Sequence, residues 1–160
     1  MNTMTEESKI GFAREHIDQS ASTRDVPYKW IVVVDSSLPA GRAVNAAVCV
    51  ASATMGRTRG ILGDDAIDSD GAVHPGLPWI GCTVLGAEAA KLAEVRAKAA
   101  VAPGVVLVDM PTQAQHTRVY EDYLFAVSST RGPDLSYYAV SVFGPRKTID
   151  KIAKGLSLLS

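Results

Sequence analysis

The sequence has only two cysteines, Cys49 and Cys82, among its 160 residues. Two cysteines cannot build the disulfide framework that stabilises small secreted domains, and no apolar segment typical of a secretory signal precedes them. Each lies within an apolar run, so we expect both to be buried, reduced thiols. The sequence therefore predicts a cytoplasmic protein.

Long apolar stretches and a large net charge are also missing. No stretch of about 18 apolar residues has the flanks of a membrane span, so we expect no membrane partner. The formal net charge is -1, whereas a domain that grips a phosphate backbone usually carries a basic excess. This balance argues against a nucleic-acid partner and leaves a small molecule of unknown identity as the expected ligand.

Several motifs of known chemistry are absent from the sequence. It contains no HxxxH, HExxH or CxxC pattern, so we assign no metal. The stretch LPAGRA lacks the glycines and the GK[ST] ending of a P-loop, and no G-x-S-x-G element occurs. We therefore expect no cofactor.

What the sequence does contain is an alternation of apolar runs and amphipathic segments. Apolar residues make up 47% of the chain and charged residues 21%, as in ordinary globular proteins. Residues 1–25 have few large apolar groups and are expected to form a flexible N-terminal arm. Residues 26–160 are expected to form a single α/β domain.

Continuous β-branched runs such as YKWIVVVD (28–35) are typical of strands buried on both faces. The expected strands are 28–35, 79–85, 105–109 and 135–144, with a short hairpin within 64–78. The expected helices are 42–56, 86–104, 112–130 and a last helix that begins at Pro145. This order predicts a three-layer α/β fold, in which a four-stranded mixed, mostly parallel sheet carries helices on both faces.

The last segment, GPRKTIDKIAKGLSLL (144–159), has the features of a complete helix. Pro145 stands at the first helical position, Ile149 and Ile152 share one face, and Gly155 lies near the end. The apolar residues after it are Leu156, Leu158 and Leu159. They either form a homodimer contact or close over the sheet of their own chain, and both alternatives stay open.

This segment resembles the ending of the type II peptidyl-tRNA hydrolases, in which Gly-Pro is followed by a helix containing Ile-Asp, a glycine and a Leu-rich tail. Residues 30–53 resemble that family's strand, glycine loop and Ala-rich helix, and residues 79–109 resemble its central strand, helix and strand ending in Asp. The whole chain is still more similar to an uncharacterised bacterial family placed in the same fold, through LPAGRAVNAA, DSDGAVHPGLPWI, TQAQHTRVYEDYL and FGPRK. The resemblance implies a type II peptidyl-tRNA hydrolase-like fold.

The sequence departs from the hydrolase family at functional positions. The family's functional lysine falls on Val44, and the arginine after its first strand falls on Asp35. A valine can neither hold phosphate nor polarise a carbonyl, and the aspartate reverses a charge where a polyanion would approach. The helix predicted at 112–130 also replaces a short turn of the family, and its role is open.

Polar residues follow the expected strands at the sheet edge where ligands bind in open α/β proteins. The expected catalytic residues are Asp109, Thr112 and Gln115. The expected ligand-binding residues are Asp35, Gly41, Arg42, Asn45, Gln113 and His116. If the carboxylates of Asp35 and Asp109 lay within a few Å, the pKa of one would rise and suit it to act as an acid or base. The alternative for each is a helix-capping or turn-forming role.

Three functions remain open at this point. The first is a hydrolase-like enzyme of the type II peptidyl-tRNA hydrolase fold that acts on a small ester or amide. The second is a non-catalytic domain that binds a small ligand on the same scaffold, which Val44 and Asp35 favour. The third is genuine peptidyl-tRNA hydrolysis with rearranged residues.

Overall fold

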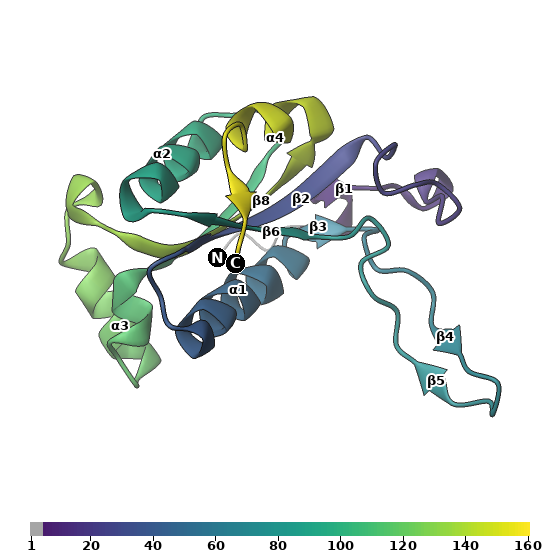
Figure 1. Ribbon diagram of the computed structural model, residues 1–160, viewed down its shortest axis with the longest axis horizontal. Coiled ribbons are helices and arrows are strands. Elements are labelled where there is room, and N and C mark those ends of the chain that lie inside the picture. Colours follow the sequence, from purple (N-terminus) through teal and green to yellow (C-terminus); the bar gives the residue numbers. More distant parts are fainter. Residues whose placement is uncertain (1–4) are drawn as a thin grey trace.

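The computed structural model describes residues 5–160, so the first four residues of the expected arm lie outside the described part. Its centre is a five-stranded sheet with the order β7-β8-β2-β6-β9 (Figure 1). The strands are β2 (Tyr28–Asp35), β6 (Thr83–Ala87), β7 (Val106–Pro111), β8 (Tyr137–Pro145) and β9 (Ser157–Leu158).

The strand pairing corrects the expected sheet. β8 lies between β2 and β7 and is antiparallel to both, and in this sheet only the β2–β6 pair is parallel. The fifth strand is the C-terminal tail, which pairs antiparallel with β6 through Leu158 and Leu85. The sheet is therefore mixed, but it has five strands. Antiparallel pairs predominate because β8 lies between β2 and β7 and runs in the direction opposite to both. The tail therefore extends the edge of its own sheet.

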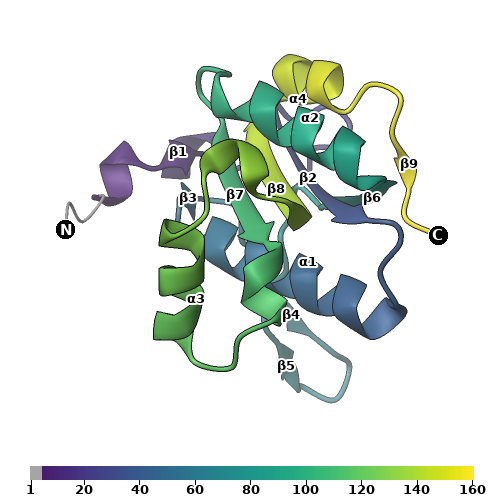
Figure 2. The same cartoon turned by 90° about the vertical axis from the view of Figure 1, so that its left-hand side faces the viewer.

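Helices cover both faces of the sheet, which confirms the layered α/β architecture (Figures 1 and 2). The helices are α1 (Ala40–Met55), α2 (Ala89–Ala100), α3 (Tyr120–Ser128) and α4 (Arg146–Ile152). α1 packs on one face, and α2 with α4 packs on the other. None of the helices within residues 5–160 has the length and apolar character needed to span a membrane.

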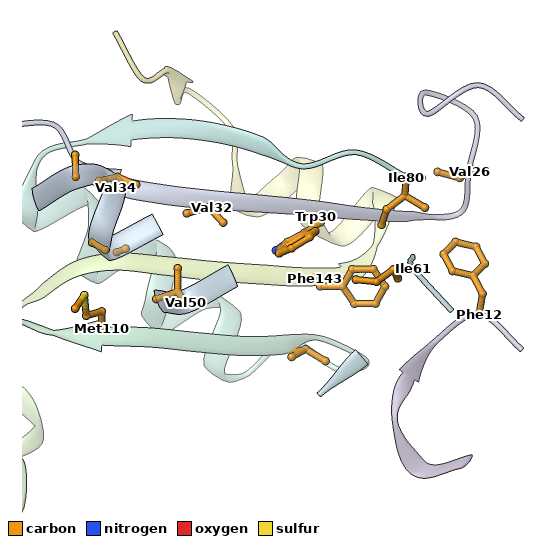
Figure 3. Packing of buried hydrophobic residues seen from close by; sticks show 14 residues of the cluster. Phe12, Val26, Trp30, Val32, Val34, Val50, Ile61, Ile80, Met110 and Phe143 are labelled. Carbon is orange, nitrogen blue, oxygen red and sulfur yellow. The ribbon is translucent and has the colours of Figure 1, made fainter. Parts of the chain in front are cut away.

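The β-branched run of β2 contributes side chains to the apolar clusters on both faces of the sheet. Trp30, Val32 and Val34 face α1, and Figure 3 shows them in that cluster together with Val50 and Phe143. The alternate residues Ile31 and Val33 face α2 and α4. Side chains alternate along a strand, so a central strand covered on both faces must be apolar at nearly every position.

A chain of buried hydroxyl groups crosses the α1 layer. The indole Nε1 of Trp30 donates to Ser141 Oγ at 2.8 Å, and Ser141 Oγ lies 2.7 Å from Thr54 Oγ1. Thr54 Oγ1 in turn donates to the carbonyl of Val50 at 2.7 Å. If the Ser141 hydroxyl donates to Thr54, every one of these buried groups is satisfied.

The segment before β2 is packed against the domain, which corrects the expectation of a flexible arm for the described residues. β1 (Ile10–Gly11) pairs with β3 (Thr58–Arg59), and short 3-10 helices occupy Glu6–Ser8 and Arg14–His16. Phe12 is only 4% exposed, and its ring lies 4.7 Å from that of Trp79. Burial of Phe12, with Ile10 and Ile17 packed against the same cluster, fixes a segment that is otherwise mostly polar.

The hairpin expected within 64–78 is confirmed, and it projects from the body of the domain (Figure 1). β4 (Ala66–Ile67) and β5 (Val73–His74) pair antiparallel. The Asp68 carboxylate accepts backbone N–H groups of Asp70 and Ala72, both at 2.9 Å, and closes the turn.

The helix expected at 112–130 is divided. Thr112–Gln115 forms a 3-10 helix, residues 116–119 form a turn, and α3 follows. The break occurs where Thr117 donates its hydroxyl to the carbonyl of Gln113 at 3.1 Å and Val119 is extended. None of the residues of α3 is buried, so this helix lies against the domain without entering its core.

Candidate functional site

A cleft of about 450 Å³ lies between α1, β7 and the segment that leads into α3. Residues of α1, of β7 and of the first turn of α3 line it. The lining residues are Asn45, Cys49, Val50, Ala53, Val108, Asp109, Met110, Ala114, Thr117, Arg118, Val119, Tyr120 and Tyr123. Most of the wall is therefore apolar, with a few polar groups.

The helical repeat of α1 explains its contribution to the cleft. Ala46 and Val50 are buried against the sheet. The residues one position away, Asn45, Cys49 and Ala53, are spaced by four and form a single stripe. This stripe faces β7, which is an edge strand.

Four of the expected site residues meet near the N-terminal end of α1. Gln115 Nε2 donates to the carbonyl of Arg42 at 2.9 Å and to Asn45 Oδ1 at 3.1 Å. His116 lies beside them, with its Nε2 atom 3.1 Å from the hydroxyl of Tyr138. The Arg42 guanidinium lies 5.9 Å from the centre of the Tyr138 ring, within range of a cation–π contact.

The Gln115 contact has a consequence for Asn45. Because Asn45 Oδ1 accepts from Gln115, the remaining hydrogen-bonding group of its amide is the Nδ2 donor. Asn45 lines the cleft, so this donor is available to a bound molecule. Gln115 thus acts as a positioning residue for Asn45. The buried Oε1 of Gln115 has no hydrogen-bond partner among residues 5–160.

Tyr138 is a member of this cluster that the sequence analysis missed. It is half-buried on β8 and next to the fully packed Tyr137. The only signal in the sequence is the alternation of β8, which places the two tyrosines on opposite faces of the sheet.

Asp35 and Asp109 do not form a carboxylate pair. β8 lies between their strands, so these strands are about 10 Å apart. Asp35 is 7% exposed, and its Oδ1 accepts from the Ser37 backbone N–H at 2.9 Å and from its hydroxyl at 2.7 Å. Asp35 therefore has the turn-forming role that the sequence analysis left open as the alternative. It does not line the cleft.

Asp109 lines the cleft, but its carboxylate is held from the other face of the sheet. Arg96 Nε of α2 donates to Asp109 Oδ2 at 2.9 Å, and this hydrogen bond raises the pKa of Arg96. The neighbours Val108 and Met110 pack towards α1, so alternation directs Asp109 towards α2. The carboxylate of Asp109 is therefore one half of an ion pair with α2.

Of the expected site residues only Asn45 and Asp109 line the cleft, and the others lie outside its lining. Thr112 Oγ1 is 3.3 Å from Ser136 Oγ, and Gln113 Nε2 donates to Thr130 Oγ1 at 3.4 Å. These contacts connect the segment after β7 to the chain before β8. Gly41 is the second residue of α1, with open space around the position of a Cβ atom, so nothing approaches it closely.

Two further features of the cleft concern its titratable groups. Burial raises the pKa of the Tyr123 phenol, and the neighbouring Tyr120 and Asp109 add to this rise, so the phenol stays protonated. Cys49 is exposed in the cleft wall, which corrects the expectation that both thiols are buried. Cys82 is exposed as a residue outside the cleft, although its thiol is largely buried. Within residues 5–160, no cluster of three or more His, Cys, Asp or Glu side chains is suited to hold a metal ion.

Comparisons with known proteins identify the family. A family model described as "Protein of unknown function (DUF2000)" matches residues 28–160. The chain belongs to the DUF2000 family. A solved structure of a protein of unknown function from Agrobacterium tumefaciens strain C58 has the same fold, with a TM-score of 0.77 and 18% sequence identity over 84% of this chain and 99% of that one. No curated protein matches the sequence.

Proposed function

We propose that this DUF2000 protein is a non-catalytic domain that binds a small molecule in the cleft between α1, β7 and α3. The observation that carries the proposal is the cleft itself, with its volume of about 450 Å³. Small-molecule sites usually enclose about 300–1,000 Å³ and are mainly apolar, with a few polar groups that orient the ligand.

The lining indicates which chemistry the ligand has. Val50, Val108 and Met110 offer an apolar floor, and the rings of Tyr120 and Tyr123 lie 5.4 Å apart at one side. The polar groups are mainly donors: Asn45 Nδ2, which Gln115 positions, and the Arg118 guanidinium. The Asp109 carboxylate is engaged by Arg96. This arrangement suits a molecule with an aromatic or aliphatic body and an accepting group, of which a carboxylate is the best match.

The contacts of the described residues favour binding over hydrolysis. Nucleophilic catalysis by a Ser, Thr or Cys side chain requires its hydroxyl or thiol beside a base. Thr117, in the cleft, donates its hydroxyl to a backbone carbonyl, and His116 contacts Tyr138. No Ser, Thr or Cys side chain within residues 5–160 is hydrogen-bonded to a histidine.

The finer description of the scaffold is also a proposal. We infer a type II peptidyl-tRNA hydrolase-like scaffold, supported by the Gly-Pro sequence at the end of β8, directly before α4, and by Asp109 near the end of β7. Two free thiols support a cytoplasmic location. A homodimer stays a prediction, which the molar mass from light scattering tests directly.

A panel of small aryl and alkyl carboxylic acids, each with its uncharged amide, tests the proposed function. A ligand at 100 times its Kd adds about 2.7 kcal/mol to the free energy of unfolding, which shifts the melting temperature by several degrees. We expect some acids to produce this shift in the wild type. Ala53→Phe, which fills the cleft, should abolish it, and Ser52→Gln, on the exposed face of α1, should retain it.

The proposal is wrong if no member of the panel stabilises the wild type. It is equally wrong if Ala53→Phe, shown to be folded by circular dichroism, responds to every acid as the wild type does. Hydrolysis of the matching ethyl esters provides the test of the enzymatic alternative.

A further inference from the structure

A second hollow, of about 360 Å³, lies at the opposite end of β2 from its junction with α1. β2 begins at Tyr28, but its pairing with β6 begins only at Ile31, so the first residues of β2 have no neighbour on that side. The loops before the two strands border the gap. The lining residues are Thr23, Arg24, Lys29, Trp30, Ile80, Gly81, Cys82, Thr83 and Arg146, none of which lines the α1–β7 cleft.

The lining contains three cationic side chains and no carboxylate. Of the three, Lys29 pairs with Asp150 on α4 at 2.7 Å. No carboxylate within residues 5–160 lies within 4.0 Å of the Arg24 or Arg146 guanidinium. On a chain with a formal net charge of -1, this hollow therefore concentrates uncompensated positive charge.

Arg146 is held in place by the backbone. Its Nε donates to the carbonyl of Val26 at 2.8 Å, and its Nη2 donates to the carbonyl of Thr23 at 2.6 Å. Carbonyl oxygens orient the guanidinium without neutralising it. An immobilised guanidinium with its charge intact loses little side-chain entropy when it binds an oxyanion.

The other groups in the hollow suit the same kind of ligand. Thr23 and Thr83 contribute hydroxyl groups, which donate to oxyanions. Trp30 and Ile80 form the inner wall, where Figure 3 shows Ile80 above β2 near Val26. The volume exceeds that of a single oxyanion and leaves room for the rest of a small molecule.

We infer that this hollow, formed by Arg24, Lys29 and Arg146, is a second binding site that takes the phosphate or carboxylate group of a small molecule. Arg24 is the exposed cation of the site, and Arg146 is the cation that backbone carbonyls hold in place. The site is independent of the proposed function, because the two hollows share no residue.

The experiment titrates the wild-type protein with inorganic phosphate, and separately with acetate, at constant ionic strength held with chloride. We expect saturable changes in the backbone amide resonances of Gly81 and Thr83 and in the indole resonance of Trp30. Arg24→Gln should weaken the binding about tenfold, because one charge-assisted hydrogen bond is lost. Arg131→Gln removes the same charge from an exposed position outside the hollow and should leave the affinity unchanged.

A saturable response to either anion supports the inference, and the preference between phosphate and acetate identifies the group. Absence of saturable changes at these resonances overturns it. Equal weakening by Arg24→Gln and Arg131→Gln also overturns it, because the anion would then respond only to the overall charge.

Discussion

Arg96 Nε lies 2.9 Å from Asp109 Oδ2, and this contact joins α2 to the edge strand β7. The carboxylate that the sequence places at the end of a strand, where catalytic groups often occur, is thus one half of an ion pair. The same guanidinium lies 5.4 Å from the centre of the Tyr137 ring. Asp109 therefore holds two layers of the fold together at the rim of the cleft.

The substitution Asp109→Asn tests this assignment. We expect it to lower the free energy of unfolding by about 1 kcal/mol, because the pair is partly exposed and screened by water. Ligand-induced stabilisation in the cleft should persist, since the donors at Asn45 and Arg118 are unchanged. Urea denaturation and the carboxylic-acid panel measure the two effects, and complete loss of ligand response in a folded variant would assign Asp109 to the ligand site.

Two glycines provide a matched test of the packing of the N-terminal segment. Gly11 has a φ of 146°, and a Cβ atom there would lie 2.0 Å from the carbonyl oxygen of Arg59. Gly11→Ala should therefore detach β1 from β3, with faster hydrogen exchange at residues 10–12. Gly41→Ala, in α1 with open space around it, should instead raise the free energy of unfolding by about 0.5–1 kcal/mol. Unchanged exchange at residues 10–12 in Gly11→Ala would contradict the β1–β3 pairing.

The hydroxyl chain from Trp30 to Val50 predicts a large effect at one serine. Ser141→Ala removes the acceptor of the Trp30 indole and a partner of Thr54, both of which are buried. An unsatisfied buried donor costs about 1–3 kcal/mol, so we expect a loss of about 2 kcal/mol in the free energy of unfolding. The control Ser52→Ala, at an exposed position on α1, should change stability by less than about 0.5 kcal/mol. Similar values for the two variants would show that the chain contributes little.

The reactivity of the Cys82 thiol should have an unusual dependence on pH. Cys82 is exposed as a residue, yet burial of its thiol raises its pKa to about 12 from an ordinary value of 9.0. Because the thiolate is the reactive form, its alkylation rate should keep rising through the alkaline range without levelling near pH 9.0. Peptide mass spectrometry after timed iodoacetamide pulses measures this rate. The unfolded protein is the control, in which the Cys82 rate should level near the ordinary value, and levelling there in the folded protein would contradict the prediction.

Much of the fold follows from local sequence patterns. The run at 28–35 is a strand, and 42–55 of the expected helix 42–56 is helical, because their apolar spacing is set by neighbours along the chain. The order of the strands is not local. The insertion of β8 between β2 and β7 depends on pairing between residues about a hundred positions apart, which no periodicity encodes.

Part of the candidate site could also be predicted from the sequence. Arg42, Asn45, Gln115 and His116 meet because polar residues that follow strand ends gather at one edge of the sheet. The pairing of Asp109 with Arg96 was not predictable, because it depends on how α2 is rotated over β7. The cleft was not predictable either, because residues of α3 also line it. α3 has no buried residue, so its sequence does not indicate which part of the domain it contacts.

Protection of Cys49 from iodoacetamide tests the central claim most directly, because this thiol lies in the cleft wall and Cys82 lies outside it. The measurement compares alkylation of both cysteines in the presence of each carboxylic acid that raises the melting temperature. The account predicts that these acids slow alkylation of Cys49 in a saturable manner, with the Kd found from the thermal shift, and leave Cys82 unaffected. Acids that stabilise the protein but leave the Cys49 rate unchanged would contradict the binding of a small molecule in this cleft.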